Sequence, residues 1–80
     1  MTTQEIKANL RLKVKNKKAK EVVKIYENNQ AKLKAGSDLE EGLILNDICL
    51  EEMGNRLKKT SFFVGGLKDE QIYMYFKSKI

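Results

Sequence analysis

Apolar residues recur every three or four positions along most of this chain of 80 residues, and that spacing is the period of an α-helix. The most regular series consists of Leu39, Leu43, Leu50, Met53 and Leu57. A series of this kind buries one side of a helix against the rest of a molecule. We therefore expect a long helix that begins at a capping box, formed by Ser37 and Glu40, and ends at about residue 58.

The apolar positions of the first half change direction partway along. Ile6, Leu10 and Val14 share one side of a helix, whereas the apolar residues between 19 and 33 point about 150° away from them. One straight helix cannot bury both sets against the same surface. We expect a break in the polar stretch 16–18, a first helix over about 3–15 that starts at a Thr2 and Glu5 capping box, and a second helix over about 18–34.

A β-hairpin is the alternative for this segment. Leu10, Leu12 and Val14 alternate with basic residues, which is the period of a strand. A strand over 10–14 that pairs with a second strand over 22–26 would satisfy that pattern. The spacing of the residues leaves both interpretations of residues 10–26 open.

Glycines delimit the remaining elements. Gly36 suits the left-handed conformation that ends a helix, and the pair Gly65 and Gly66 marks a turn before a closing helix over about 68–79. The face of that helix carries Ile72, Tyr73, Phe76 and Ile80. The predicted fold class is mainly α: a small bundle of three to four helices, with a short N-terminal β-hairpin as the alternative.

The length and composition limit the classes of protein. Residues 1–80 suffice for a single small domain, with a basic half over 1–35 and an acidic amphipathic helix and a C-terminal helix over 36–80. Cys49 is the only cysteine, so no internal disulfide can form, and we expect it to be a small buried apolar residue. Histidine is absent, which excludes Cys/His zinc sites and removes the usual acid–base catalyst.

No arrangement of residues points to catalysis. The acidic pairs are sequence neighbours, and on a helix neighbouring side chains diverge by about 100° and cannot act on one atom. Glycine-rich phosphate loops are missing from the sequence. We predict a protein that is not an enzyme and has no cofactor and no metal. The chain also lacks an apolar run of the roughly 20 residues needed to cross a bilayer and an N-terminal signal segment, so we expect a cytoplasmic protein with no membrane partner.

Positive charge is concentrated in the first half. The whole chain carries a formal charge of +5; residues 1–35 hold ten basic and three acidic residues, and residues 36–80 hold six basic and eight acidic ones. Between residues 11 and 24, seven of fourteen positions are basic. Such a block either solvates a helix face or needs an anionic partner. The second interpretation predicts binding of nucleic acid through its phosphates.

The candidate nucleic-acid-binding residues fall in two groups. The first comprises Arg11, Lys13, Lys15, Lys17, Lys18, Lys20 and Lys24. On a continuous helix Lys13, Lys17, Lys20 and Lys24 would form one row, about 16 Å long. The second group comprises Arg56, Lys58 and Lys59, with Phe62 and Phe63 as candidates for stacking on bases or, alternatively, for the core. Only two arginines are present, so we expect RNA or single strands rather than base-specific major-groove recognition.

A protein partner is the alternative to nucleic acid. Ile44 and Ile48 lie one turn apart, among acidic residues and off the main apolar series. They either pack in the core or form a docking patch for another protein. In size and in its Lys/Asn-rich composition the chain resembles small accessory proteins encoded by phages or mobile elements. The alternative function is therefore a regulator or inhibitor of a larger enzyme, including a nucleic-acid-processing one, and self-association is a further option.

Overall fold

The computed structural model describes residues 2–36, 39–60 and 65–80, and within these ranges the chain forms a bundle of four helices, which confirms the predicted small helical bundle. Its helices are α1 (Thr3–Lys15), α2 (Ala19–Lys34), α3 (Leu39–Lys59) and α4 (Asp69–Ser78), and no strand occurs in these ranges. Residues 10–26 therefore belong to α1, α2 and the turn between them. The N-terminal hairpin is not formed.

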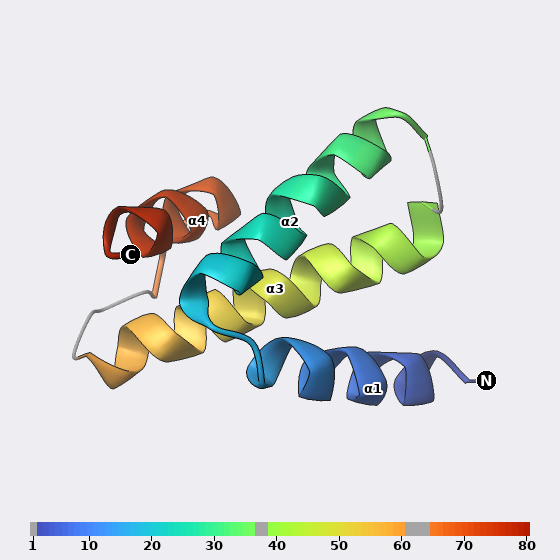
Figure 1. Cartoon of the computed structure of the whole chain (residues 1–80), viewed down its shortest axis with the longest axis horizontal. Helices are drawn as coiled ribbons and strands as arrows, with labels where there is room; N and C mark the ends of the chain where they lie inside the picture. Colours follow the sequence, from blue (N-terminus) through green and yellow to red (C-terminus); the bar gives the residue numbers. More distant parts are fainter. Residues whose placement is uncertain (1, 37–38, 61–64) are drawn as a thin grey trace.

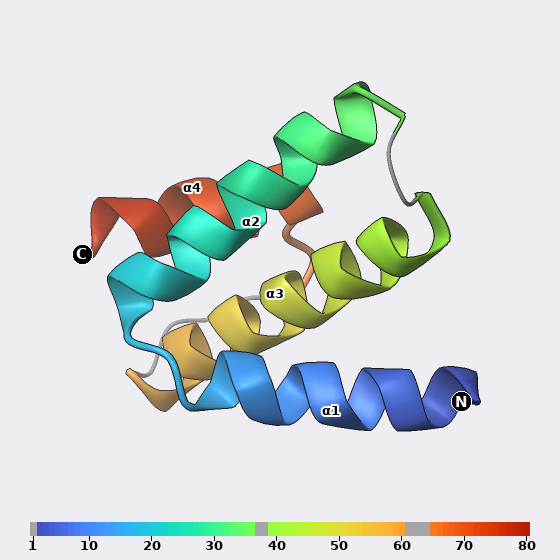
Figure 2. The same cartoon turned by 45° about the vertical axis from the view of Figure 1, so that its right-hand side comes forward.

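Helix α3 lies in the middle of the bundle, and α1, α2 and α4 each pack against it, while α2 also contacts α4. Figures 1 and 2 show that α1 and α3 run in the same direction and that α2 runs the opposite way on the other side of α3 from α1. The C-terminal ends of α1 and α3 and the start of α2 therefore meet at one end of the molecule. The N-terminal ends of α1 and α3 lie at the other end.

Local sequence explains where the helices begin and end. The Thr2 hydroxyl accepts a hydrogen bond from the backbone N–H of Glu5 at 3.2 Å, and this bond caps α1. Helix α1 stops at Asn16, and Lys18 has extended backbone angles before α2 begins, so the break lies where the apolar direction changes. Gly36, with φ of +79°, ends α2 in the left-handed conformation, and Gly66, with φ of +84°, takes it before α4. Ser37 lies outside the described residues.

The core contains the residues that face α3 and those of α3 itself. The side chains of Val14, Val22, Cys49 and Met53 are fully buried. The burial predicted for Cys49 is confirmed, and it raises the pKa of the thiol to about 11. Between α2 and α3 the only buried polar residue among those described, Asn29, donates a hydrogen bond to the carbonyl oxygen of Gly42 at 2.8 Å.

The buried side of α3 differs from the one that the apolar series predicts. Leu50, Met53 and Leu57 are buried, but Leu39 and Leu43 are 54% and 58% exposed. Ile48, for which the sequence leaves both the core and a docking patch open, is only 3% exposed and belongs to the core. Three helices surround α3, so its buried arc is wider than one stripe, and α4 has ten residues against the 21 of α3, too few to cover its first turns (Figure 1).

Candidate nucleic-acid interface

Most of the predicted basic residues gather where α1 and α3 end. Lys13 and Lys15 lie in the last turn of α1, Lys17 and Lys18 lie in the turn before α2, and the last turn of α3 carries Arg56, Lys58 and Lys59. Two segments about 40 residues apart in the sequence are thus brought together. Lys20 and Lys24 lie one turn apart on the exposed side of α2, away from its buried residues.

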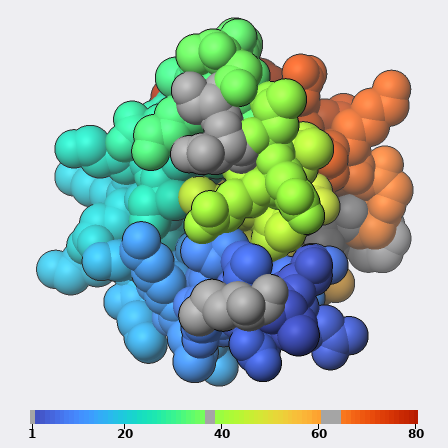
Figure 3. Space-filling model, turned by 90° about the vertical axis from the view of Figure 1, so that its right-hand side faces the viewer, coloured from blue at the N-terminus to red at the C-terminus, as the bar shows by residue number. Residues whose placement is uncertain are grey.

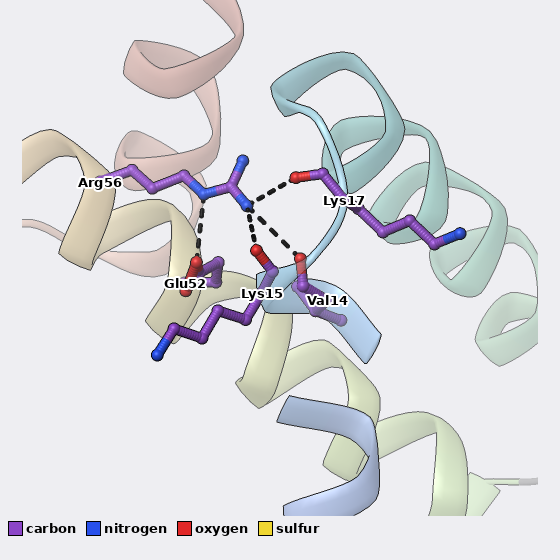
Figure 4. A network of polar contacts seen from close by, with 5 residues as sticks. All are labelled: Val14, Lys15, Lys17, Glu52 and Arg56. Atoms are coloured by element: carbon purple, nitrogen blue, oxygen red, sulfur yellow. Dashed lines mark hydrogen bonds and ion pairs between the residues drawn. The ribbon is translucent and has the colours of Figure 1, made fainter. Parts of the chain in front are cut away.

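Arg56 joins these segments through its guanidinium group (Figure 4). Its Nη2 donates to the backbone carbonyls of Val14, Lys15 and Lys17 at 3.4, 3.3 and 2.7 Å, and its Nε donates to Glu52 at 3.1 Å. A cation at the C-terminal end of a helix compensates carbonyls that have no partner within the helix. Arg56 is therefore committed to holding α1 on α3. Its Nε and Nη2 already bond a carboxylate and backbone carbonyls of the protein, so its predicted role as a nucleic-acid ligand stays a prediction that would compete with these bonds.

The remaining basic groups do not form a single row. The break between α1 and α2 removes the continuous helix on which Lys13, Lys17, Lys20 and Lys24 would align. Figure 4 shows the side chains of Lys15 and Lys17 pointing in opposite directions from the turn. Lys13 lies about 160° around α1 from Lys15. The predicted stripe is thus divided among several sides of the basic end.

One set of basic side chains does converge, on a groove between α1 and α3. The groove has a volume of about 400 Å³, and we name it the basic groove after the four cationic residues on its walls, Arg11, Lys15, Lys58 and Lys59. Its other lining residues are Ile48, Glu51, Glu52 and Asn55. From the sequence, Glu51 is only one of the acidic residues around Ile44 and Ile48, and Asn55 has no role, because nothing in the order of residues shows that α1 packs beside them.

The cationic residues of the basic groove differ in whether they are already paired. Arg11 Nη2 lies 3.5 Å from Glu51 Oε2, and the two side chains are 55% and 52% exposed. Lys15, Lys58 and Lys59 are exposed and have no ion pair within the described part of the chain. With Glu52 paired to Arg56, the groove keeps on its walls three lysines that have no ion pair in the described ranges. Such a site attracts an anion.

The opposite end of the molecule carries acidic residues. Figure 3 looks onto this end, where the first turns of α1 and α3 reach the surface. Those turns contain Glu5, Glu40 and Glu41. Acidic groups at helix N-termini and basic groups at helix C-termini both compensate the helix dipole. Because α1 and α3 are parallel, their acidic first turns lie at one end and their basic last turns at the other, whereas the antiparallel α2 brings Lys32 and Lys34 to the end with the acidic turns.

A second polar cluster joins α2 to α4 and was not predicted. Glu27 accepts hydrogen bonds from the Tyr73 hydroxyl and from Lys77 Nζ, the latter at 2.8 Å. These bonds, with that of Lys77 the larger cause, lower the pKa of Glu27, and the bond to Glu27 raises the pKa of Tyr73 and of Lys77. The Tyr73 ring also packs against the ring of Tyr26, with 4.8 Å between centroids. This cluster serves as a clamp between helices.

The remaining predicted site residues are Ile44, Phe62 and Phe63. Ile44 is half-buried beside the core, and Phe62 and Phe63 lie outside the described residues. Over the ranges that the structure describes, no three His, Cys, Asp or Glu side chains gather as metal ligands would. Within the same ranges, no helix is both long enough and apolar enough to span a membrane.

Comparison with known proteins gives no relative. No protein-family model matches the chain, and no curated protein sequence or solved structure matches it either. The functional argument therefore depends on the geometry of the basic groove and its surroundings.

Proposed function

We propose that the protein is a non-enzymatic accessory protein that binds the phosphate backbone of a nucleic acid at the basic groove. The observation that supports this proposal is that Lys15 and the pair Lys58 and Lys59, far apart in the sequence, line the same groove without carboxylate partners among the described residues. Lysine is a point charge that binds phosphate without reading bases. Lys13, Lys17, Lys18, Lys20 and Lys24 do not line the groove and can add only long-range attraction.

RNA or another single strand is the preferred ligand. A flexible strand can bend a phosphate into a groove of about 400 Å³, whereas a duplex is stiff over about 50 nm. The described residues contain only two arginines, and each is paired with a carboxylate of the protein, so base edges have few candidate ligands here. Binding is therefore expected to depend on strand flexibility and salt more than on sequence.

Fluorescence anisotropy with a labelled single-stranded RNA and the corresponding duplex tests the proposal. The logarithm of the affinity should fall with the logarithm of the salt concentration with a slope of about −3, because each phosphate contact to a single strand contributes about −0.7. Replacing Lys15, Lys58 and Lys59 by Gln should reduce the magnitude of the slope by about 2.

The matched control replaces Lys32, Lys34 and Lys68 by Gln, which removes the same charge away from the groove. This control should keep most of the slope. Equal losses in the two triple variants would show that total charge, and not the groove, causes binding. A salt-independent affinity of the unchanged protein would contradict nucleic-acid binding altogether.

Protein binding is the second candidate, and the exposed leucines of α3 favour it. Leu39 and Leu43 are more than half exposed and lie one turn apart, beside Glu40 and Glu41. They replace the predicted Ile44 and Ile48 patch as the apolar surface of this helix. If they anchor a regulator or inhibitor on its target, alanine at both positions should weaken that complex by more than about 2 kcal/mol. Purification from lysate with and without nuclease separates the two candidates, since only a protein complex survives nuclease.

A further inference from the structure

Arg11 differs from the other cationic residues of the basic groove in both chemistry and state. It is the only arginine on the groove walls, and its guanidinium can hold a phosphate with two parallel hydrogen bonds, which an ammonium group cannot do. In the structure Glu51 accepts from Arg11 Nη2 at 3.5 Å. The groove thus contains a strong phosphate ligand together with an internal carboxylate that competes for it.

The ion pair between Arg11 and Glu51 is weak enough for a phosphate to replace Glu51, and it adds little to the stability of the fold. Both side chains are more than half exposed, and ion pairs of this kind contribute only about 0–1 kcal/mol. The neighbouring pair of Arg56 and Glu52 is different, because its side chains are 23% and 18% exposed and Arg56 also binds three carbonyls. Adjacent acidic residues of α3 therefore have separate roles.

We propose that Arg11 is the phosphate-binding arginine of the basic groove and that Glu51 is the carboxylate that a phosphodiester displaces from it. This inference rests on the proposed function and adds to it a determinant of affinity. Glu51 occupies Arg11 until a phosphate enters, and it lowers the attraction of the groove for weakly bound anions. A nucleic-acid strand can therefore bind Arg11 only where its phosphate reaches both the Arg11 guanidinium and the unpaired lysines of the groove.

The test is a double-mutant cycle on Arg11 and Glu51, measured by anisotropy with the same single-stranded RNA. Glu51→Gln should strengthen RNA binding about three- to fivefold at about 0.1 M salt, because binding then no longer has to break one exposed ion pair. Arg11→Gln should weaken binding, and Arg11→Lys should weaken it less, because charge remains while the fork is lost. In the Arg11→Gln background, Glu51→Gln should gain less than about twofold, since the guanidinium it would release is absent.

Glu40→Gln removes the same charge at the opposite end of α3 and serves as the control, with an expected change of less than about twofold. Additive effects of Arg11→Gln and Glu51→Gln would overturn the inference while leaving the proposed function intact, because Glu51 would then act only as a distant charge. An unchanged affinity of Glu51→Gln would overturn it in the same way. Failure of the unchanged protein to bind any strand would overturn both proposals. Far-UV circular dichroism and urea unfolding establish that each variant is folded.

Discussion

Two glycines of α3 occupy opposite packing environments. A Cβ atom built on Gly42 would lie 2.7 Å from Leu33 Cδ2 and 3.5 Å from Asn29 Oδ1, so α2 and α3 approach each other closely there. A Cβ atom on Gly54 meets no described atom within 4 Å. Both residues lie inside a helix, where glycine lowers the free energy of unfolding by about 0.5–1 kcal/mol relative to alanine. Only the first glycine has a packing reason for its small size.

Alanine at these positions should therefore have different consequences. Gly54→Ala is expected to raise the free energy of unfolding by about 0.5–1 kcal/mol. Gly42→Ala gains the same helix preference but must move the end of the Leu33 side chain, so it should be about 0.5–1.5 kcal/mol less stable than Gly54→Ala. Urea unfolding measures both variants. If steric contact is the cause, Leu33→Ala should reduce the cost of Gly42→Ala, and a strictly additive double variant would contradict that cause.

The end of α1 is held by a side chain from another element, at a position where the sequence suggests only a surface charge. Arg56 lies in the last turn of α3 and reaches three carbonyls at the end of α1 and in the turn that follows. A lysine has the same charge but cannot bond these carbonyls and Glu52 together, because it lacks the planar fork.

Arg56→Ala should lower the free energy of unfolding by about 1–2 kcal/mol, the range for a partly buried cation at a helix C-terminus. Arg56→Lys should lose about half of that amount, and Arg11→Lys, at an exposed ion pair, about 0–1 kcal/mol. Urea unfolding of the three variants checks this order. An Arg56→Lys variant as stable as the unchanged protein would mean that the charge alone matters.

The clamp between α2 and α4 predicts a pH dependence. Hydrogen bonds from Lys77 and Tyr73 lower the pKa of Glu27 below its usual 4.5. A carboxyl group whose pKa is lower in the folded state contributes stability above its unfolded pKa and loses it as the pH falls through its folded pKa. Glu27→Gln should therefore be less stable than the unchanged protein at about pH 7, and the difference should shrink below about pH 4.5 and disappear in stronger acid.

Urea unfolding at a series of pH values checks this expectation. Tyr73→Phe retains the ring packed on Tyr26 and removes one of the two donors, so its pH dependence should lie between those of the other two proteins. Stability curves for Glu27→Gln and the unchanged protein that stay parallel throughout the acid range would contradict a role for this carboxylate.

The elements could be predicted well from local patterns because their causes are local. The change of apolar direction near Asn16 predicts the break between α1 and α2, and the positive φ of Gly36 and Gly66 agrees with the expected turns. The buried side of α3 could not be predicted in the same way. A periodicity analysis assumes one buried stripe, whereas α3 is covered by three helices, so Ile48 is buried and Leu43 is exposed.

At the scale of the whole molecule, the basic groove depends on topology that no single helix encodes. The sequence identifies Lys15, Lys58 and Lys59 as basic, but they share a groove only because α1 runs along α3 in the same direction and ends beside Arg56, in the last turn of α3. For the same reason Arg56 lies close to the end of α1 and bonds backbone carbonyls there. Charge composition alone therefore gives the candidates, and the helix arrangement decides which of them converge.

This distinction between composition and arrangement leads to a last prediction. The unfolded chain carries the same 16 basic residues as the folded protein, so binding that depended on composition alone would be similar in both states and would leave stability unchanged. Binding at the basic groove requires the folded state. Single-stranded RNA at about one hundred times its dissociation constant should then raise the free energy of unfolding by up to about 2.7 kcal/mol.

The measurement is urea unfolding with and without the RNA, followed by circular dichroism at wavelengths where the protein signal dominates. The variant with Gln at Lys15, Lys58 and Lys59 should show little stabilisation at the same RNA concentration, whereas the variant with Gln at Lys32, Lys34 and Lys68 should show most of it. The two variants have equal net charge, so a difference between them separates the folded groove from the charge of the chain. If RNA binds the unchanged protein but does not stabilise it, its lysines bind as a flexible polycation would, and the convergence of α1 and α3 has no part in recognition.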